Sequence, residues 1–186
     1  MSGMGDTDRT EPRVFLRAVE ERDIDCRVRW LNDPVVNRTL NFDLPVSHLS
    51  TKLWLQRAAV DASRRDFTVC LKSDGTQIGY TGLVNIDWRT RKAEAYSAIG
   101  EPSYWSKGFA TEMRLQLNAF AFEHLGLNRL YAYVWTKNPA MLKVAKRVGF
   151  TEEGLLRADV FSHGEYRDRI VLGMLRSDYE AQRMAS

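Results

Sequence analysis

The chain has 186 residues, of which 44% are hydrophobic and 27% are charged, a balance typical of one ordinary soluble domain. Its formal net charge of +3 comes from basic residues interspersed with acidic ones, which argues against a nucleic-acid partner. No apolar run reaches the ~18 residues of a membrane span, there is no signal-peptide core, and the two cysteines have no metal-type spacing. We therefore expect a cytoplasmic protein without a metal, with a single domain at 13–180 between tails at 1–12 and 181–186.

Strand-like and helix-like patterns succeed one another in the first half of the chain. Asp23 and Ser47 (or Ser50) stand where N-caps are favoured, each ahead of a helical pattern. The turn that contains Gly75 separates two strand-like runs. In chain order we expect a strand at 13–17, helices at 23–34 and 47–65, and strands at 67–71, 77–87 and 92–100.

The second half alternates single strands with single helices. Met113, Leu117 and Ala121 recur at the spacing of a core-facing helix, and Gly126 is suited to end that helix. In chain order we expect a helix at 110–125, a strand at 130–135, a helix at 138–148, and a hairpin with strands near 155–161 and 170–175. This order predicts an α/β fold in which helices cover both faces of a mixed sheet.

The stretch from Tyr104 to Glu112 joins a predicted strand to a predicted helix. A turn at a helix N-terminus exposes unpaired backbone N–H groups, and the helix dipole adds partial positive charge there. Gly108 would let a phosphate approach the backbone closely. The spacing matches neither a Walker loop nor a dinucleotide-binding glycine run. Taken alone, the stretch fits a phosphate site and an ordinary turn equally well.

A second motif makes the pattern more specific. Asn138-Pro139-Ala140 begins a helix, and Gly149-Phe150 closes it. Together with residues 105–110, this segment resembles the GNAT acetyltransferases, in particular the Rim-type N-acetyltransferases and their amino-sugar-modifying relatives. The resemblance extends over nearly the whole chain, from Phe15-Leu16-Arg17 to residues 164–168. It implies an α/β GNAT fold with a central, mixed, largely antiparallel and splayed β-sheet flanked by helices, and acetyl-CoA as the cofactor.

The resemblance also implies a set of contacts with coenzyme A. The turn would hold the pyrophosphate, and the end of the preceding strand would pair with the pantetheine arm. Trp105 stands where the family often has Arg or Gln, although Trp is familiar in the Rim-like branch. Lys107 could instead be a surface lysine, and Asn138 could simply cap its helix. The implied cofactor-binding residues are Ile99, Gly100, Trp105, Ser106, Lys107, Gly108, Phe109, Ala110, Thr111, Asn138 and Lys143.

Transfer of an acetyl group to an amine requires a base. Glu94 is our first candidate, because charged residues are depleted within strands, although it could be an outward-facing, solvated glutamate. Asp159 is the second catalytic candidate and Asp87 a weaker one. Of the three histidines, we consider only His163 near the substrate side.

The sequence departs from the family where a proton donor is expected. Met141 stands where the Rim-type branch usually has Ser, and Ala145 stands where other GNATs carry Tyr. A thioether donates no proton. Tyr96, Tyr104 or a water would have to protonate the leaving thiolate, unless no donor is required.

The expected acceptor is a small-molecule amine. Aromatic faces beside carboxylates suit a sugar-like or cationic amine, although such residues are often core or solvated. We expect an amino sugar or an aminoglycoside-type antibiotic; the alternative is a protein N-terminus or a polyamine. A different class of function is a non-catalytic module that binds acetyl-CoA. A homodimer is one assembly we consider. The predicted substrate-binding residues are Trp30, Asp33, Asp87, Trp88 and His163.

Overall fold

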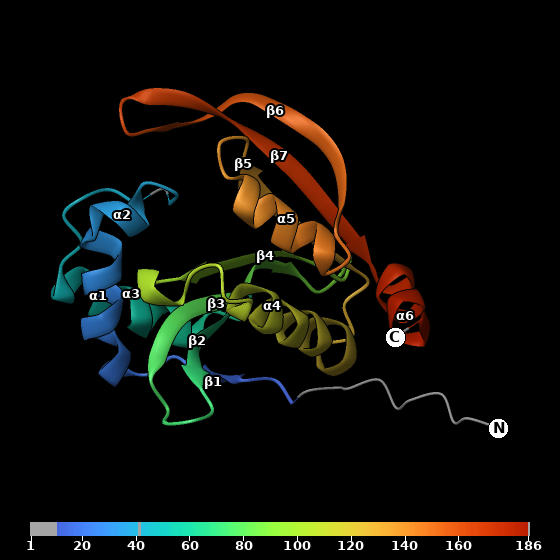
Figure 1. The fold of residues 1–186 in the computed structure, drawn as a ribbon, viewed down its shortest axis with the longest axis horizontal. Helices are drawn as coiled ribbons and strands as arrows, with labels where there is room; N and C mark the ends of the chain where they lie inside the picture. Colours follow the sequence, from blue (N-terminus) through green and yellow to red (C-terminus); the bar gives the residue numbers. More distant parts are fainter. Residues whose placement is uncertain (1–10, 41, 186) are drawn as a thin grey trace.

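A sheet with strand order β1-β2-β3-β4-β5-β7-β6 forms the centre of the computed structural model (Figure 1), which describes residues 11–40 and 42–185. All neighbouring strands are antiparallel except β4 and β5, which are parallel. The mixed, largely antiparallel sheet expected from the sequence is thus confirmed. The strands are β1 (Val14–Ala18), β2 (Arg65–Leu71), β3 (Gln77–Asp87), β4 (Lys92–Ile99), β5 (Arg129–Trp135), β6 (Thr151–Ser162) and β7 (Glu165–Leu175).

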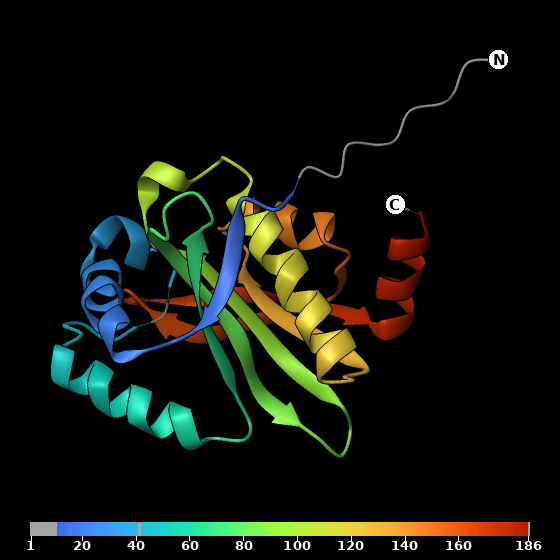
Figure 2. The same ribbon diagram turned by 90° about the horizontal axis from the view of Figure 1, so that it is seen from below.

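Helices cover both faces of this sheet, with α1 and α3 at one side of the molecule and α4 and α5 at the other (Figure 2). The larger core contains Leu117 from α4, Ala145 from α5 and Tyr179 from α6. A separate cluster packs Trp30 of α1 against the sheet. The helices are α1 (Ile24–Asn32), α2 (Pro34–Asn37), α3 (His48–Val60), α4 (Phe109–Ala119), which continues as a π-helix (Phe120–His124), α5 (Pro139–Arg147) and α6 (Arg176–Ala185).

Several boundaries differ from those expected. The α3 helix ends at Val60 rather than near residue 65, because the chain enters β2 there. Its start follows the capping rule, since the Ser47 and Ser50 side chains bond reciprocally to each other's backbone N–H groups. Residues 181–185, expected as part of a tail, belong to α6. The expected N-terminal tail falls largely on residues 1–10, which lie outside the described residues.

The parallel contact between β4 and β5 is short. It comprises only three residue pairs, Lys92–Arg129, Ala93–Leu130 and Glu94–Tyr131. Beyond them β4 stays paired with β3 on its other side, as far as Ile99. The two strands therefore part, as the splayed sheet implied by the resemblance requires. The crossover that a parallel pair needs is formed by α4, which begins just past the end of β4.

Asp23 ties the first strands to the first helix, but not as the side-chain helix cap expected from the sequence. Its carboxylate accepts two bonds from Arg17 (2.7 and 2.8 Å), one from Thr68 (2.8 Å) and one from Gln77. The Asp23 residue is only 2% exposed. Burial opposes its ionisation, but the bonds from Arg17, the Glu20 backbone N–H and Thr68 outweigh burial and lower the pKa of Asp23.

We predict that Asp23→Ala lowers the free energy of unfolding by about 3 kcal/mol, because it leaves the partly buried Arg17 and the buried Thr68 without their partner. Since the folded-state pKa of Asp23 is depressed, its contribution is present at neutral pH and is lost as the pH falls below about 4. Urea unfolding at several pH values measures both effects. The matched control is Asp25→Ala, whose side chain is 90% exposed. Equal stability of the two variants at pH 7 would contradict the role of Asp23.

Candidate active site

The turn between β4 and α4 presents a row of free backbone N–H groups. Among the residues that the structure describes, none accepts a hydrogen bond from the N–H groups of residues 106–110. Two of these residues adopt left-handed conformations, Ser106 with φ of 60° and Gly108 with φ of 89°. Consecutive amides in such a turn, at the positive end of a helix dipole, form a concave site for an anion. This geometry fits a phosphate.

Arg13 also reaches this turn, and the sequence did not reveal it. A Cβ atom added to Gly108 would lie 3.2 Å from Arg13 Nη2. The same guanidinium lies 4.2 Å from the ring centre of Phe109. Arg13 stands about a hundred positions upstream of the turn, so only the pairing of β1 in the sheet brings the two together. No local pattern in the sequence could have shown this.

The free edge of β4 lies next to the turn. Gly100 donates its N–H to the carbonyl of Ile78 on β3 (2.9 Å). Because bonding directions alternate along an antiparallel strand, the backbone groups of Ser97 and Ile99 point the other way, toward β5. The Ile99 carbonyl accepts a hydrogen bond from Trp105 Nε1 (2.9 Å). The structure therefore leaves Ile99 N–H and Ser97 for an extended ligand, whereas the Gly100 N–H is already engaged.

Residues on α5 are placed less decisively. Asn138 accepts a hydrogen bond from the N–H of Met141 (3.1 Å), which is the helix-capping role. Lys143 is exposed. Met141 packs against the main core and Ala145 is buried within it. Methionine and alanine carry no hydroxyl group, so neither position can donate a proton to the leaving thiolate.

Tyr96 cannot take over as proton donor in the described arrangement. Its hydroxyl already donates to the carboxylate of Asp66. Burial, and then the negative charge of Asp66, raise the pKa of Tyr96 well above its usual range. Tyr104 packs edge-on against Phe109 at a ring distance of 5.6 Å. Of the two tyrosines considered from the sequence, only Tyr104 is without such a bond.

Glu94 lies where β4 and β5 part. It is paired in register with Tyr131, half-buried, and accepts a hydrogen bond from Asn85 Nδ2 (3.1 Å). Burial raises the pKa of Glu94, while the bond from Asn85 and the charge of Arg169 act in the opposite direction. Burial and the neighbouring Glu94 charge likewise raise the pKa of Tyr131. A half-buried carboxylate held by a neutral amide can accept a proton from a bound amine.

Asp159 and His163 lie on the β6–β7 hairpin but differ from Glu94 in their partners. Asp159 is paired with Arg169, whose guanidinium lies over the Tyr133 ring at 4.2 Å. The Asp159 carboxylate is thus already engaged by a cation, whereas Glu94 has only the amide of Asn85 as a hydrogen-bond partner among the described residues. His163 Nε2 lies 3.2 Å from the carbonyl oxygen of Asn37, which joins the hairpin tip to the end of α2.

The remaining predicted substrate residues are not gathered into one site. Trp30 is 2% exposed, packs on Gly100 and donates its Nε1–H to Glu101 (2.8 Å). It is therefore a core residue and offers no open face. Asp33 accepts from Val35 N–H (2.8 Å) as the cap of α2.

Asp87 and Trp88 lie in the β3–β4 turn, at the opposite end of β4 from the amide row. Asp87 accepts the N–H groups of Arg89 (2.9 Å) and Thr90 (3.0 Å), so it shapes the turn. Trp88 donates its Nε1–H to the carbonyl of Ala62 (3.1 Å). Their roles in substrate binding stay predictions.

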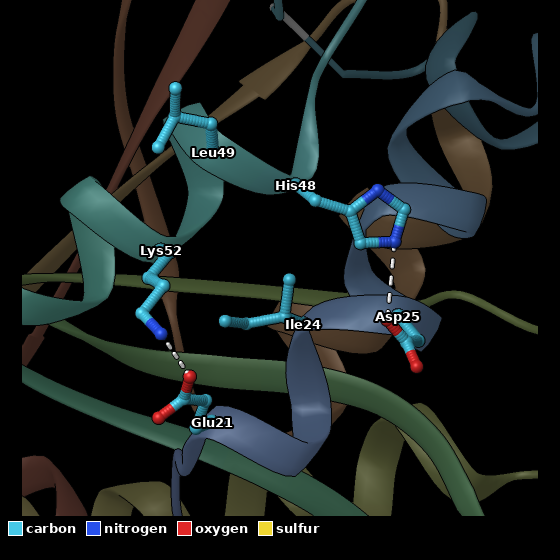
Figure 3. A pocket seen from close by; sticks show the side chains of 6 residues that line it. All are labelled: Glu21, Ile24, Asp25, His48, Leu49 and Lys52. Carbon is cyan, nitrogen blue, oxygen red and sulfur yellow. Dashed lines mark hydrogen bonds and ion pairs between the residues drawn. The ribbon is translucent and has the colours of Figure 1, made fainter.

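A pocket lies between the first turns of α1 and α3, and none of the predicted site residues lines it (Figure 3). Its polar side chains lie close to one another: Lys52 is paired with Glu21, and His48 Nε2 lies 3.1 Å from Asp25 Oδ1. The pocket is lined by Glu21, Ile24, Asp25, His48, Leu49 and Lys52. Within the described range, no group of three or more His, Cys, Asp or Glu side chains could hold a metal ion, and no helix is long and apolar enough to cross a membrane.

Comparison with known proteins agrees with this geometry. Residues 13–151 match the family described as the acetyltransferase (GNAT) domain. The chain belongs to the GNAT acetyltransferase family: it is an N-acetyltransferase with the GNAT fold, and acetyl-CoA is its acyl donor.

Three relatives illustrate the range of similarity. Spermidine N(1)-acetyltransferase of Escherichia coli is 33% identical over 172 residues, which cover 91% of this chain and 86% of that protein. An uncharacterized N-acetyltransferase, YokL, of Bacillus subtilis is 28% identical over 92% of this chain and 94% of that protein. The crystal structure of spermidine N-acetyltransferase from Vibrio cholerae in complex with CoA and spermine superposes on this chain with a TM-score of 0.84. The sequence identity is 27%, and the match covers 90% of this chain and 98% of that one.

We predict that Gly108→Asp abolishes CoA binding, because the new carboxylate would occupy the place of a phosphate and repel it. Isothermal calorimetry with CoA measures the loss. Gly126→Asp is the matched control, since Gly126 also follows a left-handed path (φ of 65°) with open space around it, and it lies outside the turn. Unchanged CoA affinity in a folded Gly108→Asp protein would remove the phosphate assignment.

Proposed function

We propose that the protein transfers the acetyl group of acetyl-CoA to a primary amine of a small polycation of the spermidine class. Two relatives with full-length similarity, from Escherichia coli and Vibrio cholerae, are spermidine N-acetyltransferases. The observation on this chain that supports the proposal most is Glu94, a half-buried carboxylate with no ion pair of its own among the described residues. Such a group attracts a cationic amine and can then deprotonate it.

The residues of this chain divide the work between two places. The N–H groups of residues 106–110 hold the pyrophosphate, and the β4 edge at Ser97 and Ile99 N–H pairs with the extended pantetheine arm. When bound, acetyl-CoA supplies an activated acetyl group as a thioester. Glu94 accepts the proton of the acceptor amine, so that a neutral nitrogen attacks.

The leaving group places little demand on this protein. A thiol has a pKa of about 8.5, so its thiolate is a tolerable leaving group near neutral pH. With a methionine and an alanine at the two positions where relatives of the family carry hydroxyl groups, Tyr104 or solvent delivers the final proton. Chemistry without a dedicated acid is consistent with the apolar packing of Met141 and Ala145.

The amino-sugar expectation gives way to its alternative. It drew on the likeness to amino-sugar N-acetyltransferases and on aromatic faces beside carboxylates, and one of these aromatic residues, Trp30, is buried and bonded to Glu101. The similarity to spermidine N-acetyltransferases favours the polyamine alternative. A protein N-terminus has narrower support, from a putative ribosomal N-acetyltransferase of Bacillus subtilis that is 32% identical over 59% of this chain.

The acceptor class is tested by thiol release with acetyl-CoA and a panel of amines. We predict that spermidine and spermine are acetylated with kcat/KM at least about tenfold above that of an amino sugar, an aminoglycoside or a peptide N-terminus, a difference of about 1.4 kcal/mol in transition-state binding. A preference for the sugars or the peptide would overturn the acceptor class. Turnover of none of them would point to a module that only binds acetyl-CoA.

The role of Glu94 is tested by a pH–rate profile. We predict that Glu94→Gln keeps its CoA affinity but lowers kcat by about 10²-fold or more below the pKa of the amine, where base assistance is needed. Above that pKa the neutral amine is abundant, so the defect should shrink. Because burial raises the Glu94 pKa, wild-type activity should also fall at a higher pH than an exposed glutamate would dictate. Asp159→Asn is the comparison variant; overlapping profiles of Glu94→Gln and wild type would end the assignment.

A further inference from the structure

The side chain of Arg13 joins the start of β1 to the β4–α4 turn. Arg13 Nε donates to Glu112 Oε1 (2.7 Å), and the backbone N–H of Arg13 donates to Glu112 Oε2 (2.7 Å). Arg13 Nη2 donates to the carbonyl of Lys107 (2.7 Å). The guanidinium also lies over the Phe109 ring at 4.2 Å. One residue thus contacts the turn and the first turn of α4 at four points, although it is remote in sequence.

The bond to Lys107 fixes the direction of an amide in the row. In a trans peptide the C=O and the following N–H point to opposite sides, and among the described residues only Leu44-Pro45 is cis. With the Lys107 carbonyl turned toward Arg13, the N–H of Gly108 must point away from Arg13. Gly108 is the residue for which rotation is easiest, since glycine accepts many backbone conformations. Arg13 therefore restrains the peptide of the turn that could rotate most easily, the one between Lys107 and Gly108.

The bond to Glu112 addresses a conflict of charge. Glu112 lies in the first turn of α4, where a carboxylate stabilises the helix dipole. The same negative charge would repel a phosphate bound at that helix end. Arg13 places a positive charge directly against it, and the side chain of Glu112 is only 21% exposed. The pair leaves the helix end without an uncompensated negative charge.

We propose that Arg13 is a positioning residue for CoA: it orients the Lys107–Gly108 peptide and neutralises Glu112, so that the amide row accepts the pyrophosphate. The proposal rests on the assignment of this turn to CoA. It does not require Arg13 to touch the phosphate. The two actions separate in variants, because removing Glu112 as well as Arg13 restores charge balance but not the orientation of the peptide.

The experiment measures the affinity for CoA, and the KM for S-acetylpantetheine, which has the thioester and the arm but no pyrophosphate. Arg13→Ala should weaken CoA binding about tenfold, as expected for loss of hydrogen bonds to a charged group, and should leave the KM for S-acetylpantetheine within about twofold. Glu112→Gln should bind CoA at least as well as wild type. The double variant Arg13→Ala/Glu112→Gln should lie between Arg13→Ala and wild type.

Each failure has a separate meaning. An Arg13→Ala protein that binds CoA like wild type, or that loses CoA and S-acetylpantetheine equally, overturns the proposal. A double variant as weak as Arg13→Ala overturns the proposed neutralisation of Glu112, because removal of the Glu112 charge then restores nothing. If wild type itself does not bind CoA at this turn, as Gly108→Asp reports, the proposed function fails first. Arg22→Ala is the control, since Arg22 is an exposed arginine paired with a glutamate elsewhere.

Discussion

The parallel pairing of β4 with β5 covers three residue pairs and then stops. The position of the candidate site depends on this separation of the two strands. A parallel pair demands a crossover, so the chain must leave β4, form α4 and return as β5. The α4 N-terminus is thereby placed next to the edge of β4 that β5 no longer covers. The amide row at residues 106–110, the free backbone of Ser97 and the half-buried Glu94 all lie along this same divergence.

The carboxylates of the protein are sorted by their partners rather than by their positions in the sequence. Asp23 is surrounded by donors and holds the strands together. Asp87 shapes a turn, and Asp159 is bound to an arginine. Within residues 11–40 and 42–185, the side chain of Glu94 has only a neutral amide, that of Asn85, as a hydrogen-bond partner. Burial raises the pKa of Glu94, and Glu94 has no ion pair among the described residues, which favours it as the base.

The fold could be predicted from the sequence because its strongest signals are local. Helical spacing in α4, turn residues around β2 and β3, and the glycine-bearing turn before α4 all appear within short windows. The short α2 helix has too few residues to show a period, and α6 is a polar helix that the sequence presented as a domain end and tail.

The parts of the site that were not predictable depend on long-range contacts or on burial. Arg13 meets the turn only because β1 is placed in the sheet beside α4. Trp30 and a substrate-facing tryptophan look alike in a sequence, and only packing against Gly100 distinguishes them. The sequence allows Asn138 to be a helix cap or a CoA contact, and the structure shows it as the cap of α5. The assignment of individual residues to CoA and to the acceptor stays a prediction.

The strand order also determines when the protein can be completed during synthesis. β7 is the last strand to be made, yet it lies between β5 and β6 and supplies the only neighbour of β6 within the described sheet. Until β7 has been synthesised, β6 lacks the strand that links it to β5. The core around Phe122 also needs Tyr179, whose ring stacks on that of Phe122 with the ring centres 5.0 Å apart. The C-terminal half of the described sheet is therefore complete only once β7 has been synthesised.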